Sequence, residues 1–188
     1  MPAPQKYARI ERERRFLLAR LPGAPKPVRV RHIVDRYLDG TRLRLREQSD
    51  DDGGAICKLT QKLPSPGRGA RQGLITNMYL SEDEFRVLAQ LPARKLVKTR
   101  YSLPPFGIDV FEGRLRGLVL AKAEFDSAAA ARALVLPAFL LREVTADIRF
   151  TGGQLVRASR GDVRKWLSEY GIALPETIAA AGPSVHWQ

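Results

Sequence analysis

Charged and apolar residues alternate in several short stretches of this chain, and this period of two limits its fold more than any other feature. Residues 42–46 read Arg-Leu-Arg-Leu-Arg, so three guanidinium groups fall on one face of an extended strand. Other stretches also place charged residues on one face: Glu11, Glu13 and Arg15; Lys58 and Lys62; Lys98 and Arg100; Glu143, Asp147 and Arg149. The opposite faces are mainly Leu, Ile, Val and Cys. We therefore expect mainly strands, each with one ionic face.

Turn and capping residues divide the chain into about eight strands and about three helices. Asp39-Gly40 predicts a tight hairpin, and Ser81 followed by Glu84 is a capping box that starts a helix. Short connections favour an α+β domain with an antiparallel sheet. The expected strands cover about residues 8–16, 28–38, 42–46, 55–63, 71–80, 95–103, two segments within 107–125, and 142–150; the other expected helices cover 128–136 and 162–170.

Length and composition suit one globular unit. The chain has 188 residues, of which 44% are hydrophobic, and neither a repeat nor a linker divides it. We expect one domain over residues 1–171 and a tail over 172–188. A single Cys57 leaves no partner for an intrachain disulfide, and the first residues lack an apolar leader. We therefore expect a cytoplasmic protein with no membrane partner.

The ionic faces allow two arrangements of the strands. In one, a half-buried sheet turns its ionic face to water, which is the ordinary cause of such alternation. In the other, a closed barrel collects the charges inside and leaves apolar residues outside, where helices and loops cover them. A lumen lined by Arg and Lys must hold water or a polyanion, because burying like charges together is costly. The formal net charge of +12 favours anionic partners, but the residues alone leave both arrangements open.

Several motifs, in order over about residues 8–160, resemble those of the CYTH superfamily, the triphosphate tunnel metalloenzymes. The segment from Glu11 to Leu17 resembles the ExExK motif of this family, with Arg15 in place of the usual Lys. Further segments are similar to the family: Tyr37-Leu38 followed by Arg44-Leu45-Arg46, Leu59 to Lys62, Lys98 to Tyr101, Ile108 to Gly113, Gly117 to Phe125, and Glu143 to Asp147. The resemblance implies a closed eight-stranded antiparallel β-barrel, the triphosphate tunnel, with about three flanking helices.

The resemblance also implies roles for particular residues. The family binds a triphosphate-type small molecule together with Mg²⁺ or Mn²⁺, and its members are often homodimers. Arg forks two phosphate oxygens, and these hard cations prefer carboxylate oxygen. Substrate binding is implied for Arg15, Arg44, Arg46, Lys62, Lys98, Arg100 and Arg149. Metal binding is implied for Glu11, Glu13, Glu124 and Glu143, the first three of which are also the catalytic candidates; Asp109 and Asp147 either bind metal or pair with a neighbouring Arg.

The chain departs from the family pattern at three positions. Gly73 and Ile75 stand where tripolyphosphatases often carry two acidic residues, and Lys122 replaces the first acid of a pair on a later strand. Neutral ligands in their place are available from Thr76 or Asn77. These changes make the expected lumen more cationic and weaken the expected hold on a second metal ion.

The function expected from the resemblance is metal-dependent hydrolysis of inorganic tripolyphosphate or a nucleoside triphosphate. Two alternatives stay open: a polyphosphate- or nucleotide-binding protein with weakened catalysis, and an activity like that of class IV adenylate cyclases. Nucleic acid is not an expected partner, because a duplex cannot enter a narrow tunnel and the sequence lacks a basic stretch with interleaved aromatic residues.

Overall fold

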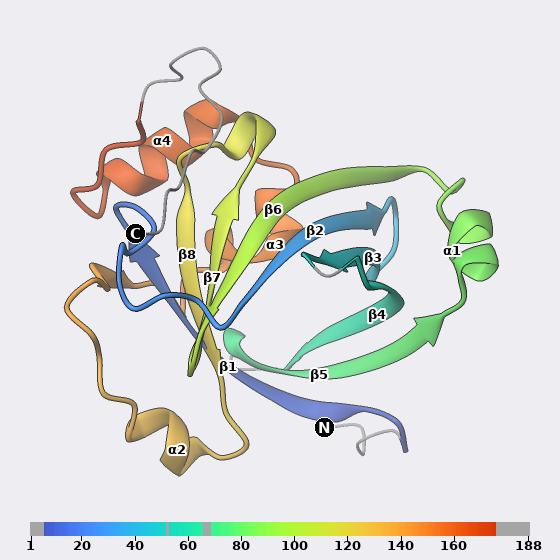
Figure 1. The fold of residues 1–188 in the computed structure, drawn as a ribbon, viewed down its shortest axis with the longest axis horizontal. Helices are drawn as coiled ribbons and strands as arrows, with labels where there is room; N and C mark the ends of the chain where they lie inside the picture. The colour runs from blue at the N-terminus through green and yellow to red at the C-terminus, as the bar shows by residue number, and fades with distance from the viewer. Residues whose placement is uncertain (1–5, 52, 66–68, 176–188) are drawn as a thin grey trace.

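The computed structural model describes residues 6–51, 53–65 and 69–175, and its main feature is a closed ring of eight antiparallel strands (Figure 1). Neighbouring strands follow the order β5-β4-β3-β2-β6-β7-β8-β1, and β1 also pairs with β5 to close the ring. The expected closed barrel is therefore confirmed, and the open half-buried sheet is excluded. The strands are β1 (Arg9–Leu18), β2 (Arg29–Leu38), β3 (Leu43–Asp50), β4 (Ala55–Ser65), β5 (Gly69–Leu80), β6 (Ala93–Leu103), β7 (Phe106–Phe111) and β8 (Val119–Glu124).

The first strand closes the barrel by dividing its length between two neighbours. Residues 9–12 of β1 pair with β5, and residues 13–18 pair with β8. Residues directly opposite each other in a ladder share one face of the sheet. Glu11 therefore shares a face with Gly73 of β5, and Glu13 shares a face with Glu124 of β8.

Local capping signals start the helices close to where the sequence predicts them. Ser81 and Glu84 form the predicted capping box at the start of α1 (Glu82–Leu88). Ser127 caps α2 (Ala128–Arg132), which ends earlier than expected, and Leu134 and Phe139 beyond its end pack against the barrel. The predicted C-terminal helix is α4 (Arg160–Ser168). The remaining helical segments are η1 (Gly113–Leu115), η2 (Ile148–Phe150) and α3 (Gly152–Leu155).

The prediction of a strand over residues 142–150 is wrong beyond its first two residues. Only β9 (Arg142–Glu143) pairs with β1. The chain then turns, because the Asp147 amide donates to the Val144 carbonyl and the Asp147 carboxylate accepts from the Arg149 amide at the start of η2. An Asp that binds its own backbone in this way favours a turn over a strand. Glu143, Asp147 and Arg149 therefore do not share a strand face.

An apolar cluster fills one end of the barrel. Leu17, Leu96 and Leu120 stand on the same strand faces as the charged residues of β1, β6 and β8, and all three are buried. They pack with Phe150 and Leu155, which come from η2 and α3. The charged part of the lumen is therefore bounded on one side by the segment that follows β9.

A second apolar cluster covers the outside of the barrel. Phe16, Ile108 and Ala121 alternate with the lumen-facing residues of β1, β7 and β8 and are buried. Leu134 and Phe139, which follow α2, pack against them. This is the covering of outward apolar residues that a barrel with a charged interior requires.

The C-terminal part of the described chain continues the core. Residues 172–175 fall within the predicted tail, and Ile172 and Leu174 are buried in the cluster at the barrel end. Residues 176–188 lie outside the described residues. None of the helices in the described ranges is both long and apolar enough to span a membrane.

Candidate functional site

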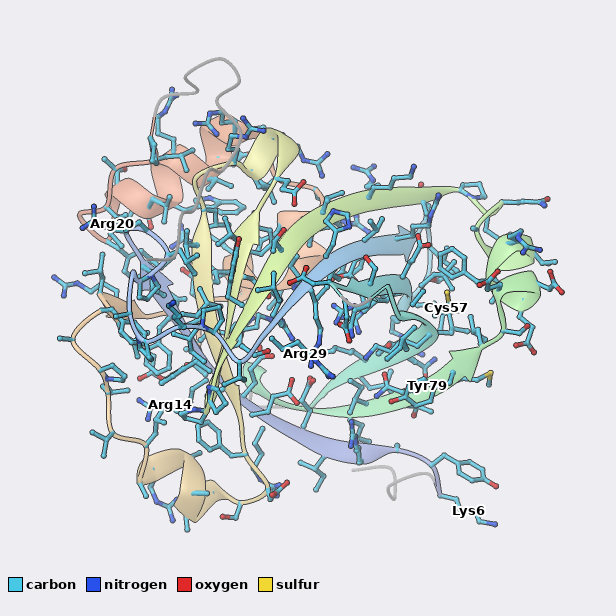
Figure 2. All side chains as sticks on the ribbon, viewed as in Figure 1. Lys6, Arg14, Arg20, Arg29, Cys57 and Tyr79 are labelled. Carbon is cyan, nitrogen blue, oxygen red and sulfur yellow. The ribbon has the colours of Figure 1, made fainter. Side chains whose placement is uncertain are left out.

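A cavity of about 810 Å³ lies inside the ring of strands. Among the described residues, its lining carries thirteen Lys and Arg side chains and four Asp and Glu side chains. Figure 2 shows side chains from several strands directed into the space that the ring encloses. The ionic faces of separate strands therefore converge on one cavity, as the barrel arrangement requires.

Three carboxylates gather where β1 meets β8. Glu11, Glu13 and Glu124 each place a carboxylate oxygen within 4.8 Å of the others. Glu11 and Glu13 are two residues apart on one strand face, and Glu124 stands opposite Glu13. The strand register thus brings together three of the four predicted metal ligands.

Cations surround these carboxylates. Lys62 donates to Glu11 at 2.6 Å, and the Lys122 ammonium lies 3.4 Å from both carboxylate oxygens of Glu13. The Arg15 guanidinium lies 3.3 Å from Glu13. Burial alone raises the pKa of Glu13, but Lys122, Lys62 and Arg15 outweigh it and lower the pKa to about 2. Glu13 is therefore ionised at any physiological pH.

Arg15 is fixed by the turn that replaces the predicted strand. Its side chain is 2% exposed, and its guanidinium donates to the Thr145 carbonyl at 2.9 Å. Its amide donates to the Thr145 hydroxyl, and its carbonyl accepts from the Val144 amide. The segment after β9 thus holds Arg15 at the edge of the carboxylate cluster.

A buried carboxylate orients two arginines on β3. Asp35 of β2 accepts two hydrogen bonds from Arg46, at 2.6 and 2.8 Å, and lies 3.4 Å from the Arg44 guanidinium. Burial raises the pKa of Asp35, but Arg44 and Arg46 outweigh it and hold the pKa far below its ordinary value. Arg44 also donates to the Thr60 hydroxyl. Both predicted arginines therefore line the cavity in fixed orientations.

A second buried carboxylate orients two basic side chains on β6. Asp109 of β7 accepts from Lys98 at 2.6 Å and from Arg100 at 2.6 and 2.9 Å. Burial raises the pKa of Asp109, but Arg100 and Lys98 outweigh it and lower the pKa far below its usual range. Asp109 was expected either to bind metal or to pair with a neighbouring Arg, and in the structure it pairs with Arg100 and Lys98. Lys98 and Arg100 line the cavity beside it.

Lys58 lines the cavity without a carboxylate in contact among the described residues. It stands opposite Arg46 in the β3–β4 ladder. Burial, together with the nearby charges of Arg46 and Arg44, lowers the pKa of Lys58 to about 8. The family resemblance implies substrate binding for Lys62 and not for Lys58, but both line the cavity.

The positions of the family departures also face the cavity. Gly73, Ile75 and Asn77 line it, whereas Thr76 stands opposite Gln61 and is not part of the lining. Asn77 accepts from the Thr60 hydroxyl at 2.8 Å. Of the two candidate neutral ligands, Asn77 is therefore the one that faces inward.

Two predicted site residues lie away from the cavity lining. Glu143 binds Arg14 through two hydrogen bonds, at 3.1 and 2.6 Å, and accepts from the Thr145 hydroxyl. Arg149 binds Asp147 and Glu169 and stacks over the Trp166 ring. The structure therefore does not bring Glu143 to the other three carboxylates, nor Arg149 to the other basic residues.

Sequence reasoning missed Asp35, which lies between Arg46 on one neighbouring strand and Leu96 on the other. A signal was present, because Asp35 is an acidic residue inside a Val- and Ile-rich strand where a charge is costly without a partner. Thr60 and Asn77 were also missed as a hydrogen-bonded pair in the lining.

Comparison with known proteins gives relatives that cover most of the chain. No family model matches it. The chain is similar to the inorganic triphosphatase of Nitrosomonas europaea, with 34% identity over 149 residues that cover 74% of this chain and 92% of that protein.

Two solved structures share the fold. A crystal structure of the inorganic triphosphatase NE1496 aligns with a TM-score of 0.52 and 27% identity, covering 79% of this chain and 95% of that chain. A crystal structure of the hypothetical protein NE1496 aligns with a TM-score of 0.53 and 28% identity, covering 79% of this chain and 99% of that chain.

Proposed function

The chain belongs to the same family as the inorganic triphosphatase of Nitrosomonas europaea, and from this premise we propose that it hydrolyses a terminal phosphoanhydride bond of a triphosphate bound in its barrel. Inorganic triphosphate is the first candidate substrate, because it is the one that the name of the relative gives. A nucleoside triphosphate is the second. The motif from Glu11 to Leu17 supports placing the family within the CYTH superfamily.

The observation that carries the proposal is a carboxylate cluster and a wall of basic side chains in the same cavity. The carboxylates gather on β1 and β8, and the opposite wall is dominated by basic side chains. A triphosphate needs cationic groups for its oxygens and a carboxylate site for the metal ion that accompanies it. The basic wall consists of Arg44, Arg46, Lys58, Lys98 and Arg100, with Asp35 and Asp109 between them.

Binding on this wall uses side chains that are already oriented. Asp35 holds Arg44 and Arg46, and Asp109 holds Lys98 and Arg100, so little side-chain entropy is lost when phosphate oxygens bind. Each carboxylate balances only one of its two cations, which leaves positive charge for the substrate. The same charge stabilises the diphosphate that leaves after cleavage.

Mg²⁺ or Mn²⁺ is the cofactor that we propose, and the donor set fits such an ion. Glu11, Glu13 and Glu124 offer three hard oxygen ligands within 4.8 Å of one another. A bound ion would supply charge at the phosphate oxygens and a water of lowered pKa. Glu11, Glu13 and Glu124 would hold such an ion, and a carboxylate oxygen of this cluster left uncoordinated would orient the water and accept its proton. Glu143 is left out of the proposed ligand set, because its carboxylate binds Arg14.

Phosphate release measured with inorganic triphosphate and with ATP, in Mg²⁺ and in Mn²⁺, tests this function. Glu13→Gln is expected to lower kcat by at least about a hundredfold, because it removes a charged ligand from the carboxylate cluster. Glu169→Gln, an exposed carboxylate outside the cavity, is the matched control and is expected to keep full activity. No release from any short-chain triphosphate in either metal would overturn the proposal.

A second candidate function is binding of polyphosphate or nucleotide without turnover. The pairing of Lys122 with Glu13 favours it, because an ammonium occupies part of the carboxylate cluster, and so do Gly73 and Ile75, which bring no acid to the lining. Tight binding of inorganic triphosphate by calorimetry with no phosphate release would select this candidate. An activity like that of class IV adenylate cyclases would instead release diphosphate from ATP.

A homodimer and a cytoplasmic location are further proposals, of which the homodimer is supported by the family resemblance. The single Cys57, which is buried and unpaired by disulfide, supports a reducing compartment. Light scattering of the purified chain tests the dimer, because a monomer would have a mass of 21.0 kDa.

A further inference from the structure

The three carboxylates at the β1–β8 junction are already matched in charge by the protein's own cations. Lys62 binds Glu11 at 2.6 Å, and Lys122 and Arg15 lie at 3.4 and 3.3 Å from Glu13. Three negative groups therefore face three positive groups before any ligand arrives. A divalent cation that enters this cluster has to compete with ammonium and guanidinium groups for the carboxylate oxygens.

The three cations differ in their freedom to move. Arg15 is 2% exposed and held by Thr145 through its side chain and its backbone. Lys62 is 43% exposed, and Lys122 is 16% exposed with no partner shorter than 3.4 Å among the described contacts. A lysine ammonium sits on a flexible four-carbon stem and binds as a point charge, so it can change partner without moving the backbone. Lys62 and Lys122 are therefore the two cations that can leave the carboxylates.

A polyanion in the cavity offers these lysines a better partner. Lys62 and Lys122 both line the same cavity as Arg44, Arg46 and Arg100, where the positive charge is in excess. A triphosphate bound on that wall presents several charged oxygens within the cavity, and charge-assisted bonds to phosphate are among the strongest that lysine makes. A lysine that turns to phosphate uncovers a carboxylate for metal.

We propose that Lys62 and Lys122 make the metal site conditional on the anion: they occupy Glu11 and Glu13 in the free protein and release them to a divalent cation when a polyanion binds. This inference rests on the proposed function only in placing a metal ion and a polyanion in one cavity. The two ligands then bind with positive coupling, and the coupling is reciprocal: each raises the affinity for the other by the same factor.

Metal binding to the free protein tests the first half of the proposal without any substrate. The dissociation constant of Mn²⁺ is measured by electron paramagnetic resonance for the wild type, Lys62→Met and Lys122→Met. Each variant is expected to bind Mn²⁺ about tenfold more tightly than the wild type, within the usual range of coupling between two sites. Lys95→Met removes an exposed lysine from the outer face of β6 and is expected to leave the constant unchanged. An unchanged constant in both test variants would overturn the proposal.

The coupling itself is measured with a triphosphate that carries methylene groups in place of its bridging oxygens, which the protein cannot hydrolyse. In the wild type, saturating analogue is expected to tighten Mn²⁺ binding, and the double variant Lys62→Met/Lys122→Met is expected to lose about tenfold of this effect. Chelation of Mn²⁺ by free analogue is common to both proteins, so the difference between them reports the lysines. Equal coupling in the two proteins would contradict the proposal.

These readouts separate this proposal from the proposed function. Lys62 is nearly half exposed, so Lys62→Met is expected to retain the fold even if Lys122→Met disturbs the interior. If the wild type releases no phosphate but the Mn²⁺ dissociation constants of the wild type and variants differ as expected, the proposed hydrolysis is wrong and the coupled metal site stands. If the wild type releases phosphate but all the proteins have the same Mn²⁺ dissociation constant, the proposed hydrolysis stands and the coupling is wrong.

Discussion

Asp35 and Asp109 each hold two basic side chains in place inside the barrel. Both carboxylates are fully buried, and each binds one partner through two hydrogen bonds. A buried ion pair gives little net stability by itself, but removing one partner leaves an uncompensated charge. These two residues are therefore expected to matter for stability as well as for the shape of the basic wall.

Asp109→Asn tests this at one position. The substitution leaves Lys98 and Arg100 buried without their counter-charge, and we expect the free energy of unfolding in urea to fall by about 3 kcal/mol. Asp39→Asn, which changes an exposed carboxylate 3.5 Å from Arg94, is the control and should cost less than about 0.5 kcal/mol. Equal losses in the two variants would contradict the role assigned to Asp109.

Lys58 predicts a pH dependence of anion binding. Its pKa is lowered to about 8 by burial and by Arg46 and Arg44, so it loses its proton as the pH rises through that value. We expect triphosphate to bind about three- to tenfold more weakly at pH 9 than at pH 7, because Lys58 loses its positive charge, and so does Lys98, whose pKa burial lowers to about 7. Lys58→Met, measured by calorimetry over the same range, should flatten this part of the profile. A wild-type profile that matches that of Lys58→Met would contradict the assignment.

At the scale of single residues, alternation and family motifs predicted the lumen positions of Glu11, Glu13, Arg44 and Arg100 correctly. They could not identify the partner of Asp35, because Arg46 is brought beside it only by the β2–β3 register. Which strands pair, and in which register, is set by the tertiary structure, whereas an alternating pattern describes one strand at a time.

At the scale of elements, the segment after β9 was the least predictable part of the fold. Residues 142–150 alternate polar and apolar side chains as a strand does, yet Val144 and Phe150 are buried on either side of a turn. A stretch this short is compatible with either a strand or a turn, and the hydrogen bond from the Arg149 amide to the Asp147 carboxylate favours the turn. Because the predicted strand does not continue, Glu143 and Arg149 do not lie on a common lumen-facing side, and both stay outside the cavity lining.

Gly152 at the start of α3 gives an element-scale prediction. A Cβ at this position would collide with the Tyr37 hydroxyl, whereas a Cβ at Gly153 would meet open space. Gly152→Ala is expected to lower the free energy of unfolding by about 1 to 3 kcal/mol by forcing Tyr37 or α3 to shift. Gly153→Ala should be within about 0.5 kcal/mol of the wild type. Thermal unfolding of both variants measures the difference, and equal midpoints would contradict the close packing.

At the scale of the whole molecule, buried carboxylates with low pKa values predict sensitivity to acid. The pKa of Glu13 is about 2 in the folded protein against 4.5 ordinarily, so the folded state resists protonation more than the unfolded state does. Its stabilisation, about 3 kcal/mol, is fully present above the ordinary pKa and is lost as the pH falls toward 2. Asp35 and Asp109 act in the same direction.

Unfolding in urea at pH 6, 4 and 2.5 measures this loss. The wild type is expected to lose stability steeply below about pH 4.5, and Glu13→Gln should lose about 3 kcal/mol less over the same interval because it has no carboxyl to protonate. Parallel curves for the two proteins would show that Glu13 is not held by its neighbours in the way described.

Because β1 pairs with both β5 and β8, the carboxylate cluster depends on a late step in the folding of the barrel. The seam of the barrel passes between Glu11, which pairs toward β5, and Glu13, which pairs toward β8, so these neighbours reach a common site only after both long-range contacts form. Contacts of such high sequence separation are late and slow in folding. A chain in which β1 has not yet paired with both neighbours would therefore lack the assembled carboxylate cluster, so the proposed metal site would form only when the barrel closes.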